Sequence, residues 1–293
     1  MMTKEKATIG VLGGSGLYEI KSLRSVRQVT VKTPFGDPSG PITIGELSGV
    51  DCAFLPRHGL GHVLLPSEIN VRANIWALKS LGVEKVIAVS AVGSLKEEMA
   101  PRHFVIPQQI IDRTKGRVST FFGQGIVAHV AFARPFCSEQ SALLAESSRG
   151  LGLTTHEGGT YLCMEGPLFS TRAESDLHRQ MGCSIIGMTA IPEAKLAREA
   201  EMCYSMAALV TDYDCWKEGE EVSNDKVAAV MQANVANAIK LLEAVIPAAA
   251  RRPRKCECAA ALEGAIFTAP KNMDRKTAKK LELLIGRFTR GRR

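Results

Sequence analysis

Two aspartates at the end of an apolar segment are the residues best suited to chemistry. The run AALV at 207–210 is followed by Thr211, Asp212, Tyr213 and Asp214. Two such carboxylates could cap a helix or bind a metal ion, but they could also recognise a purine base. A protonated carboxyl donates a hydrogen bond to adenine N7, while an ionised one accepts from the N6 amino group. Burial keeps an aspartate protonated by raising its pKa, which would make it an acid for the departing base.

A second set of residues is suited to binding an anion. The segment GGSG at 13–16 follows an apolar run, and its backbone N–H groups and serine hydroxyl could cradle an oxyanion. Arg57 and His58 follow another apolar run, where a guanidinium fork matches two phosphate oxygens and an imidazole adds a donor. Ser90 and Thr189 are hydroxyls at two further strand ends. Each group alone is as common in a turn or a helix cap, so the hypothesis depends on their convergence.

These groups lack the spacing of the common nucleotide-binding loops. The chain contains no GxGxxG segment after a strand and no Gly-Lys-Ser/Thr phosphate loop. The sequence therefore argues against a site for NAD or ATP.

The candidate groups lie between segments with alternating strand and helix patterns. Several apolar segments are continuous, which is typical of strands in a parallel sheet that is covered on both faces. The chain is therefore predicted to be an α/β protein. In such sheets ligands bind beyond the carboxyl ends of the strands, where the loops at 13–16, 56–59, 90–94 and 188–189 can converge. Strands are predicted at 7–12, 50–55, 86–89, 104–111, 184–188 and 207–211, and helices at 70–82, 191–201 and 225–244.

The net charge of +7 is concentrated in the last part of the chain. Residues 251–293 contain 13 Lys and Arg against 4 Asp and Glu, whereas residues 1–250 contain 24 against 26. We therefore divide the chain into a main domain at 1–250 and a basic extension at 251–293. The extension should begin with a linker after Pro247 and contain an amphipathic helix at 274–288. It could contact nucleic acid, but a solvated helix is the preferred interpretation, so no nucleic-acid partner is expected.

The composition also bears on where the protein acts. No window approaches eighteen uninterrupted apolar residues, so no membrane partner is expected. The apolar run near the N-terminus is broken by glycines too early for a signal peptide. We expect a cytoplasmic protein, whose thiols stay reduced. The 8 cysteines form no Cys-x-x-Cys pair and no His-bearing zinc spacing, so no metal is expected.

An ordered series of motifs over residues 8–247 resembles the methylthioadenosine phosphorylase branch of the trimeric purine nucleoside phosphorylases. The resemblance implies a single-domain nucleoside phosphorylase fold, whose mixed sheet forms a distorted barrel flanked by helices, with 1–250 as its catalytic domain. The implied activity is the phosphorolysis of 5'-methylthioadenosine to adenine and 5-methylthio-α-D-ribose 1-phosphate, a reaction of purine and methionine salvage. The motifs are GVLGGSGLY (10–18), TPFGDPSG (33–40), RHG (57–59), PSEINVRANIWALK (66–79), GSLKEE (93–98), DRT (112–114), EGPLFSTRAES (165–175), MTAIPEAKLAREA (188–200) and TDYDCWKE (211–218).

The resemblance also implies roles for individual residues. Asp212 would act at N7 and Asp214 at N6, with Asp212 and His58 taking part in catalysis. His129 would reach the 5' pocket of a neighbouring subunit, which implies a homotrimer or a dimer of trimers. Inorganic phosphate is a co-substrate, and no metal or organic cofactor is implied. Phosphate would be bound by Ser15, Arg57, His58, Ser90, Ala91 and Thr189, the ribose would rest on Met188, and Phe169 would flank the base.

Three positions leave the substrate open. Asn224 and Val227 stand where a methylthio group would need an apolar pocket, and Gly187 stands where the family often has asparagine. The alternatives are therefore a broader purine nucleoside phosphorylase that also accepts adenosine, or a methylthioinosine phosphorylase. A non-catalytic protein that binds nucleosides or nucleic acid is a further, less favoured alternative.

Four of the cysteines resemble a feature of the archaeal-like branch of the family. There, counterparts of Cys137, Cys203, Cys256 and Cys258 can form disulfides. Intracellular disulfides are mainly a trait of hyperthermophiles, and a charged fraction of 23% does not indicate one. We therefore expect free thiols.

Overall fold

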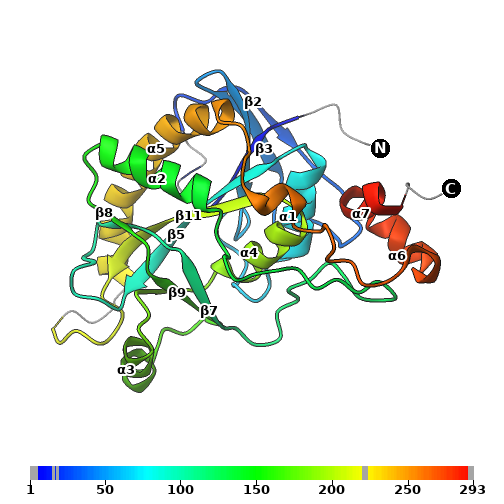
Figure 1. Cartoon of the computed structure of the whole chain (residues 1–293). Coiled ribbons are helices and arrows are strands. Elements are labelled where there is room, and N and C mark those ends of the chain that lie inside the picture. Colours follow the sequence, from blue (N-terminus) through cyan, green and yellow to red (C-terminus); the bar gives the residue numbers. More distant parts are fainter. Residues whose placement is uncertain (1–5, 15–16, 18–19, 220–223, 290–293) are drawn as a thin grey trace.

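The protein is described here by a computed structural model that covers residues 6–14, 17, 20–219 and 224–289, with side chains described from 230 onward in the last range. Within these residues strands and helices alternate along the chain (Figure 1). The strands are β1 (Ile9–Gly13), β2 (Arg24–Val29), β3 (Ile42–Leu47), β4 (Val50–Pro56), β5 (Lys85–Ser94), β6 (Phe104–Ile106), β7 (Gln109–Arg113), β8 (Thr155–Glu157), β9 (Thr160–Met164), β10 (Ile185–Gly187) and β11 (Cys203–Asp212). The α-helices are α1 (Val71–Ser80), α2 (Ser138–Gly150), α3 (Arg172–Gln180), α4 (Ala190–Glu199), α5 (Asn224–Arg251), α6 (Arg275–Lys280) and α7 (Glu282–Thr289).

The long strand β5 is the centre of the sheet. It pairs in parallel with β1 and with β11, and β1 pairs in parallel with β4. Ser90 of β5 lies opposite Ala208 of β11, and Gly13 at the end of β1 lies opposite Pro56 at the end of β4. The carboxyl ends of these strands therefore meet at one edge of the sheet, as the alternating pattern predicts.

The sheet branches at β5 and curls. One branch runs through β10, β9 and β7, and the other through β11, β6 and β8. β6 and β7 belong to different branches, yet only Pro107 and Gln108 separate them in the sequence. This short link draws the two branches together and bends the sheet towards a barrel. The mixed sheet flanked by helices confirms the predicted α/β fold.

Several predicted boundaries are wrong. The predicted strand at 104–111 is two strands, because Pro107 has no N–H to donate to a ladder. The loop predicted at 90–94 belongs to β5, which continues through Ser94. The linker predicted after Pro247 is also displaced, since α5 continues through this proline to Arg251.

Helices cover both faces of the sheet (Figure 1). α5 and α2 pack on one face, and their buried side chains share a core with strand residues such as Ile9, Val11 and Phe54. α1 and α4 pack on the other face, in a second core that includes Ile75, Leu78 and Leu196. Burial on both faces explains why these strands are continuously apolar.

One stretch of α5, Val230–Arg251, is long and apolar enough to cross a membrane by length and composition alone. Its side chains at Leu241, Leu242, Val245 and Ile246 are buried against the sheet, together with β1, β4 and β11. Core helices satisfy the same composition test, and the packing of this one against strands identifies it as a core helix.

The C-terminal segment packs on the body of the protein. Leu281, Leu284 and Ile285 of the α6–α7 region are buried in the same core as α1 and α4. Arg287 also forms an ion pair with Glu201, at an Nη2–Oε1 distance of 2.6 Å. The basic helix predicted at 274–288 is thus two short helices, of which the apolar side chains are buried.

Candidate active site

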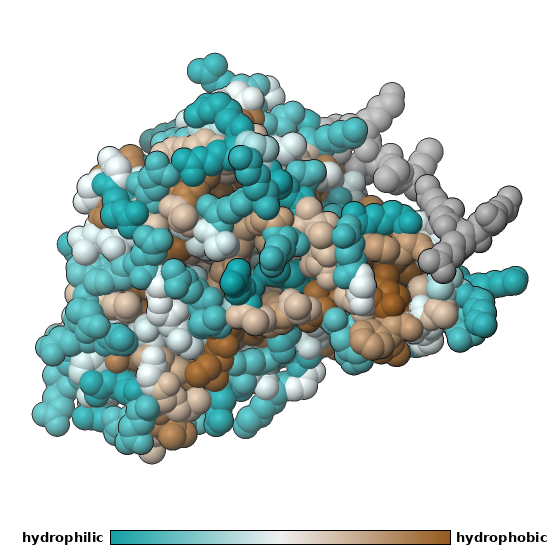
Figure 2. Space-filling model, viewed as in Figure 1, coloured by the Kyte–Doolittle hydropathy of each residue, from teal (hydrophilic) through white to brown (hydrophobic). Residues whose placement is uncertain are grey.

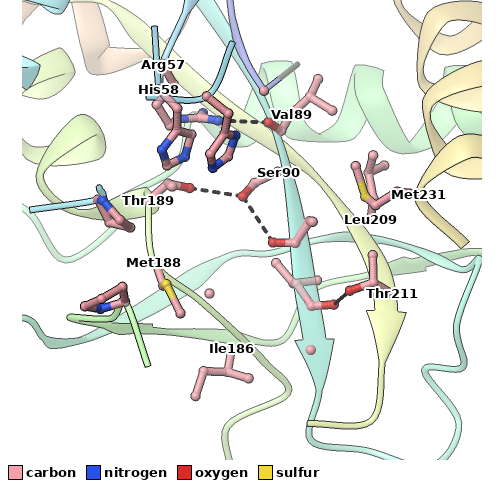
Figure 3. A pocket seen from close by; sticks show the side chains of 18 of the residues that line it. Arg57, His58, Val89, Ser90, Ile186, Met188, Thr189, Leu209, Thr211 and Met231 are labelled. Carbon is pink, nitrogen blue, oxygen red and sulfur yellow. Dashed lines mark hydrogen bonds between the residues drawn. The ribbon is translucent and has the colours of Figure 1, made fainter. Parts of the chain in front are cut away.

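A cavity of about 480 Å³ lies where the strand ends converge. Its size suits a nucleoside-sized ligand. Arg57, His58, Ser90 and Thr189 lie towards one end, which we call the anion end, and Thr211 lies at the other, the acid end (Figure 3). Of the residues predicted for the site, those that line this cavity are Arg57, His58, Ser90, Ala91, Phe169, Met188, Thr189, Asp212 and Asp214.

The Arg57 side chain at the anion end is held by a buried carboxylate and by backbone carbonyls. Its side chain is buried, and its Nε and Nη2 both donate to the carboxylate of the buried Glu193. Nη1 donates to the Val89 carbonyl at 3.0 Å and Nη2 to the Leu12 carbonyl at 3.3 Å. The fork predicted to grip two phosphate oxygens is therefore engaged by Glu193, and Arg57 brings to the cavity a guanidinium whose charge is largely offset.

His58 is a neutral hydrogen-bond acceptor at the anion end. Its Nδ1 lies 2.9 Å from the Leu64 carbonyl, and because a carbonyl only accepts, Nδ1 must carry the hydrogen. Burial lowers the pKa of His58 to about 4, and the nearby Arg57 charge contributes in the same direction. At neutral pH the imidazole is therefore uncharged and Nε2 is an acceptor. The His58 ring stacks on His62 with a centroid separation of 4.2 Å.

Two hydroxyls complete the anion end. Ser90 Oγ lies 3.0 Å from Thr189 Oγ1 and also donates to the Ala91 carbonyl at 3.2 Å (Figure 3). Thr189 precedes α4 and does not use its side chain to cap that helix. The helix-cap explanation of Thr189 is therefore wrong, and its hydroxyl is turned to the cavity.

The two aspartates behave differently. Burial raises the pKa of Asp212 above its ordinary value, although hydrogen bonds from Thr211 and from the Asp214 backbone oppose this shift. Oδ2 of Asp212 accepts from the Thr211 hydroxyl at 2.6 Å, and Oδ1 accepts from the Asp214 N–H at 2.8 Å. Oδ2 of Asp214 is buried without a hydrogen-bond partner among the described residues. The acid end thus combines a carboxyl biased towards protonation with an unsatisfied acceptor.

Of the two remaining predicted residues, only His129 can be placed, and it does not line the cavity. Ser15 lies outside the described residues. His129 is exposed, and its ring meets Phe267 edge-on at a centroid distance of 4.9 Å. Its predicted role in a neighbouring subunit's site stays a prediction.

The sequence comparisons agree with this geometry. The sequence model of the Phosphorylase superfamily matches residues 8–247. The chain belongs to this family. It is 54% identical over 282 residues to the S-methyl-5'-thioadenosine phosphorylase of Geobacter sulfurreducens, which covers 96% of this chain and 98% of that protein. It is 52% identical over 263 residues to the enzyme of the same name from Thermofilum pendens, covering 90% of this chain and 100% of that one.

Solved structures of phosphorylases share the fold. A methylthioadenosine phosphorylase from an antarctic soil metagenomic library superposes with a TM-score of 0.93 at 48% identity, covering 96% of this chain and 99% of the other. A mutant of the adenosine/methylthioadenosine phosphorylase from Schistosoma mansoni, in complex with methylthioadenosine, superposes with a TM-score of 0.79 at 38% identity. It covers 84% of this chain and 93% of the other.

Glu193 is a site residue of this phosphorylase that the sequence reasoning missed. Besides Arg57, its carboxylate accepts from the Tyr204 hydroxyl at 2.8 Å. A glutamate in the first turn of a helix is already explained by its favourable interaction with the helix dipole. The neighbouring sequence therefore gives no sign of an ion pair with Arg57. Their separation of 136 residues hides the pair from any sequence pattern.

The lack of a side chain at Gly187 has a structural reason in this phosphorylase. A Cβ at this position would lie 2.1 Å from the Tyr161 hydroxyl oxygen. That hydroxyl accepts from the Thr189 N–H at 3.4 Å, next to the anion end. The tyrosine therefore occupies the space that a side chain at 187 would need.

Apolar side chains form one wall of the phosphorylase cavity. Leu209 of β11 and Met231 of α5 lie together on this wall (Figure 3), and Val235 of α5 also lines the cavity. The sequence reasoning placed this wall at Asn224 and Val227, whose side chains lie outside those described. One helical turn further along α5 the wall is apolar.

Proposed function

We propose that this protein cleaves 5'-methylthioadenosine with inorganic phosphate, giving adenine and 5-methylthio-α-D-ribose 1-phosphate. The observation that carries the proposal is a single cavity that joins an anion end of hydroxyls and a neutral imidazole to an acid end of two aspartates. Phosphate occupies the first end, adenine the second, and the ribose lies between them on Met188.

Phosphate binding uses hydrogen bonds more than net charge. The ordinary dianion at neutral pH carries one P–O–H group, which can donate to Nε2 of His58. Ser90 and Thr189 supply hydroxyls to the remaining oxygens, and their own contact at 3.0 Å shows that both point to one spot. Because Glu193 offsets the charge of Arg57, the guanidinium serves to fix the geometry of the site and adds a modest attraction.

The departing adenine is stabilised at the acid end. Asp212 in its protonated form donates to N7, so that the electrons of the glycosidic bond leave on a neutral base. Asp214 Oδ2, buried and unpaired among the described residues, accepts from the N6 amino group. A 6-oxopurine would present an acceptor to this oxygen, so the pair favours a 6-amino base.

Bond cleavage leaves positive charge at C1' of the ribose. A phosphate oxygen held on the opposite side from the base stabilises this charge and then bonds to C1', which inverts the configuration there. The protein positions both partners, and no bond to the protein is required. We propose no metal or organic cofactor in this reaction.

The apolar wall favours a methylthio group at the 5' position. Leu209, Met231 and Val235 offer no hydrogen-bond partner to a 5'-hydroxyl, which would lose its water there. Adenosine should therefore be a poorer substrate than 5'-methylthioadenosine.

The experiment is a substrate panel with and without phosphate. Methylthioadenosine, methylthioinosine, adenosine and inosine are each incubated with the protein, and the released base and sugar phosphate are quantified. We expect methylthioadenosine to turn over fastest and only with phosphate present. Dominant inosine or methylthioinosine turnover would overturn the substrate assignment, and equal base release without phosphate would overturn phosphorolysis itself.

We also propose that the protein is a cytoplasmic homotrimer or dimer of trimers. Exposed apolar side chains support an assembly, since Val127 and Phe267 lie on adjoining segments joined by backbone hydrogen bonds, with His129 nearby. Figure 2 also shows apolar residues gathered on the viewed face, between the positions that α4 and α6 have in Figure 1. Sedimentation analysis would test the assembly, and a His129→Ala variant with unchanged KM for methylthioadenosine would remove that residue from the shared site. Free thiols support a reducing compartment.

A further inference from the structure

Four cysteine thiols meet far from the candidate active site. Cys137 immediately precedes α2, Cys203 is the first residue of β11, and Cys256 and Cys258 lie in the segment that follows α5. All four Sγ atoms lie within 4.8 Å of one another, and those of Cys203 and Cys256 are 3.3 Å apart. The four residues are free thiols in the structure.

This arrangement has the size of a tetrahedral metal site. A zinc ion with four thiolate ligands at about 2.3 Å places neighbouring sulfurs about 3.8 Å apart. Cys137, Cys203 and Cys258 are buried, whereas Cys256 is half-buried. A second cavity of about 360 Å³, lined by Cys137 and Cys203, reaches the cluster and gives an ion access.

The backbone holds the ligands in place without a metal. The Cys137 N–H donates to the Tyr204 carbonyl at 2.8 Å, which joins the start of α2 to the start of β11. Arg254 Nη2 donates to the Glu201 carbonyl at 2.7 Å, which joins the Cys256 segment to the turn before Cys203. Three separate pieces of chain are thus fixed around one point.

Two arginines lie near the cluster, where positive charge would stabilise a zinc tetrathiolate. Such a centre carries a net charge of −2, and N–H groups that donate to its sulfurs stabilise it. Arg254 interacts electrostatically with Cys203 and Cys256, and Arg198 with Cys258. Arg254 Nε is buried without a hydrogen-bond partner among the described residues and is a donor available to a thiolate.

We propose that Cys137, Cys203, Cys256 and Cys258 bind a structural Zn²⁺ ion, which fastens the C-terminal segment to the α/β body. Each thiol gives up its proton on binding, and no electron is transferred. The expectation that the chain binds no metal rested on local spacing, because the usual signatures consist of two close cysteine pairs. Here one Cys-x-Cys pair joins two cysteines from remote positions.

The test measures metal content in the whole protein. The untagged chain is purified in a phosphine reductant without chelator, incubated with one equivalent of Zn²⁺, desalted and analysed for metals. We expect about one zinc per chain. A Cys256→Ser/Cys258→Ser variant should retain at least tenfold less zinc per chain. The matched control is Cys52→Ser, because Cys52 lies outside the cluster and its Sγ already donates to the Val50 carbonyl at 3.2 Å, a bond that a hydroxyl can keep.

A second readout identifies the ligands. Cobalt added to the metal-free chain should give the intense visible absorption of a tetrahedral cobalt thiolate, absent from the double variant and present in the control. Wild-type protein without zinc under these conditions would overturn the proposal, even if the variants failed to fold. Cysteine pairs resistant to alkylation in denatured, chelator-treated and unreduced protein would also overturn it, since they would identify disulfides instead. Both readouts are independent of phosphorolysis.

Discussion

Replacing Asp212 with asparagine tests the acid end directly, because the structure fixes how the new amide must lie. If Nδ2 replaced Oδ1, it would face the Asp214 N–H at 2.8 Å, and two donors would oppose each other. If Nδ2 replaces Oδ2, the Thr211 hydroxyl can turn its hydrogen towards the Val92 carbonyl, 3.2 Å away, and accept from the amide. The second orientation leaves every group paired, so the Asp212→Asn variant should fold.

The loss should appear in catalysis. A positioned general acid contributes roughly 10²–10⁴-fold to a rate. An amide at residue 212 still donates to N7 but cannot transfer a proton, so we expect kcat/KM for methylthioadenosine to fall by about 100-fold, or about 2.7 kcal/mol. For methylthioinosine the amide can donate to O6, so the loss should be less than about tenfold. The ratio of the two substrates should therefore shift by at least an order of magnitude.

The pH dependence supplies the assay that isolates Asp212. The active form is the protonated carboxyl, whose pKa burial raises, so wild-type turnover should fall as pH rises through that pKa. Initial rates of base release at saturating phosphate, measured over a broad pH series, locate this limb. The Asp212→Asn variant should lack it. Thr211→Val should move it to higher pH, because the Thr211 hydroxyl stabilises the ionised form. An unchanged limb and an unchanged substrate ratio in Asp212→Asn would refute the assignment.

Three further changes test the rest of the site. Arg57→Ala should raise the KM for phosphate tenfold or more. It should also lower the free energy of unfolding by about 3 kcal/mol, because Glu193 loses its buried partner. Phosphate titrations and denaturant curves measure the two effects, and an unaltered phosphate KM would remove Arg57 from the anion end. The pKa of His58 is about 4 when folded and 6.5 ordinarily, so the unfolded chain binds the proton first and stability falls as pH drops from 6.5 to 4. Allowing for water in the cavity, the loss of unfolding free energy over this pH range is about 2 kcal/mol. Denaturant curves should show this loss in the wild-type protein and not in a His58→Gln variant. Equal losses in both proteins would contradict the neutral imidazole. Gly187→Ala places a methyl group 2.1 Å from the Tyr161 oxygen and should cost about 1–3 kcal/mol, read from the thermal midpoint, whereas an unshifted midpoint would show that Tyr161 yields freely.

The strand ends were predictable because their signals are local. Apolar runs marked β1, β4 and β11, and parallel pairing brings the residues that follow them to one edge. Arg57 and Asp212 could therefore be placed in one site although they are far apart in the chain. The individual roles came from the family resemblance, since spacing alone left turns, caps and metal ligands as alternatives.

Elements without a local signal were missed. β2 is exposed along most of its length and shows no apolar run, so its pairing with β3 alone makes it a strand. α5 continues through Pro247 although proline in a helix costs about 3 kcal/mol. The buried side chains of Val245, Ile246 and Ala249 on the sheet offset this cost. Long-range strand pairing decided the first case, and burial against the sheet decided the second.

The pair of Arg57 and Glu193 shows why the support of a site is harder to predict than the site. An arginine buried at the anion end would be unstable in the empty protein, since nothing would balance its charge. The Glu193 carboxylate balances the charge of Arg57 whether or not phosphate is bound. Tyr204 donates a hydrogen bond to this carboxylate, and two backbone carbonyls accept from the guanidinium. The charge that draws phosphate is thereby reduced, and binding depends on the direction of the hydrogen bonds from Ser90, Thr189 and His58. Selectivity for an anion with one proton to donate then follows from the neutral Nε2 of His58, a property of the fold that the residue type alone does not reveal.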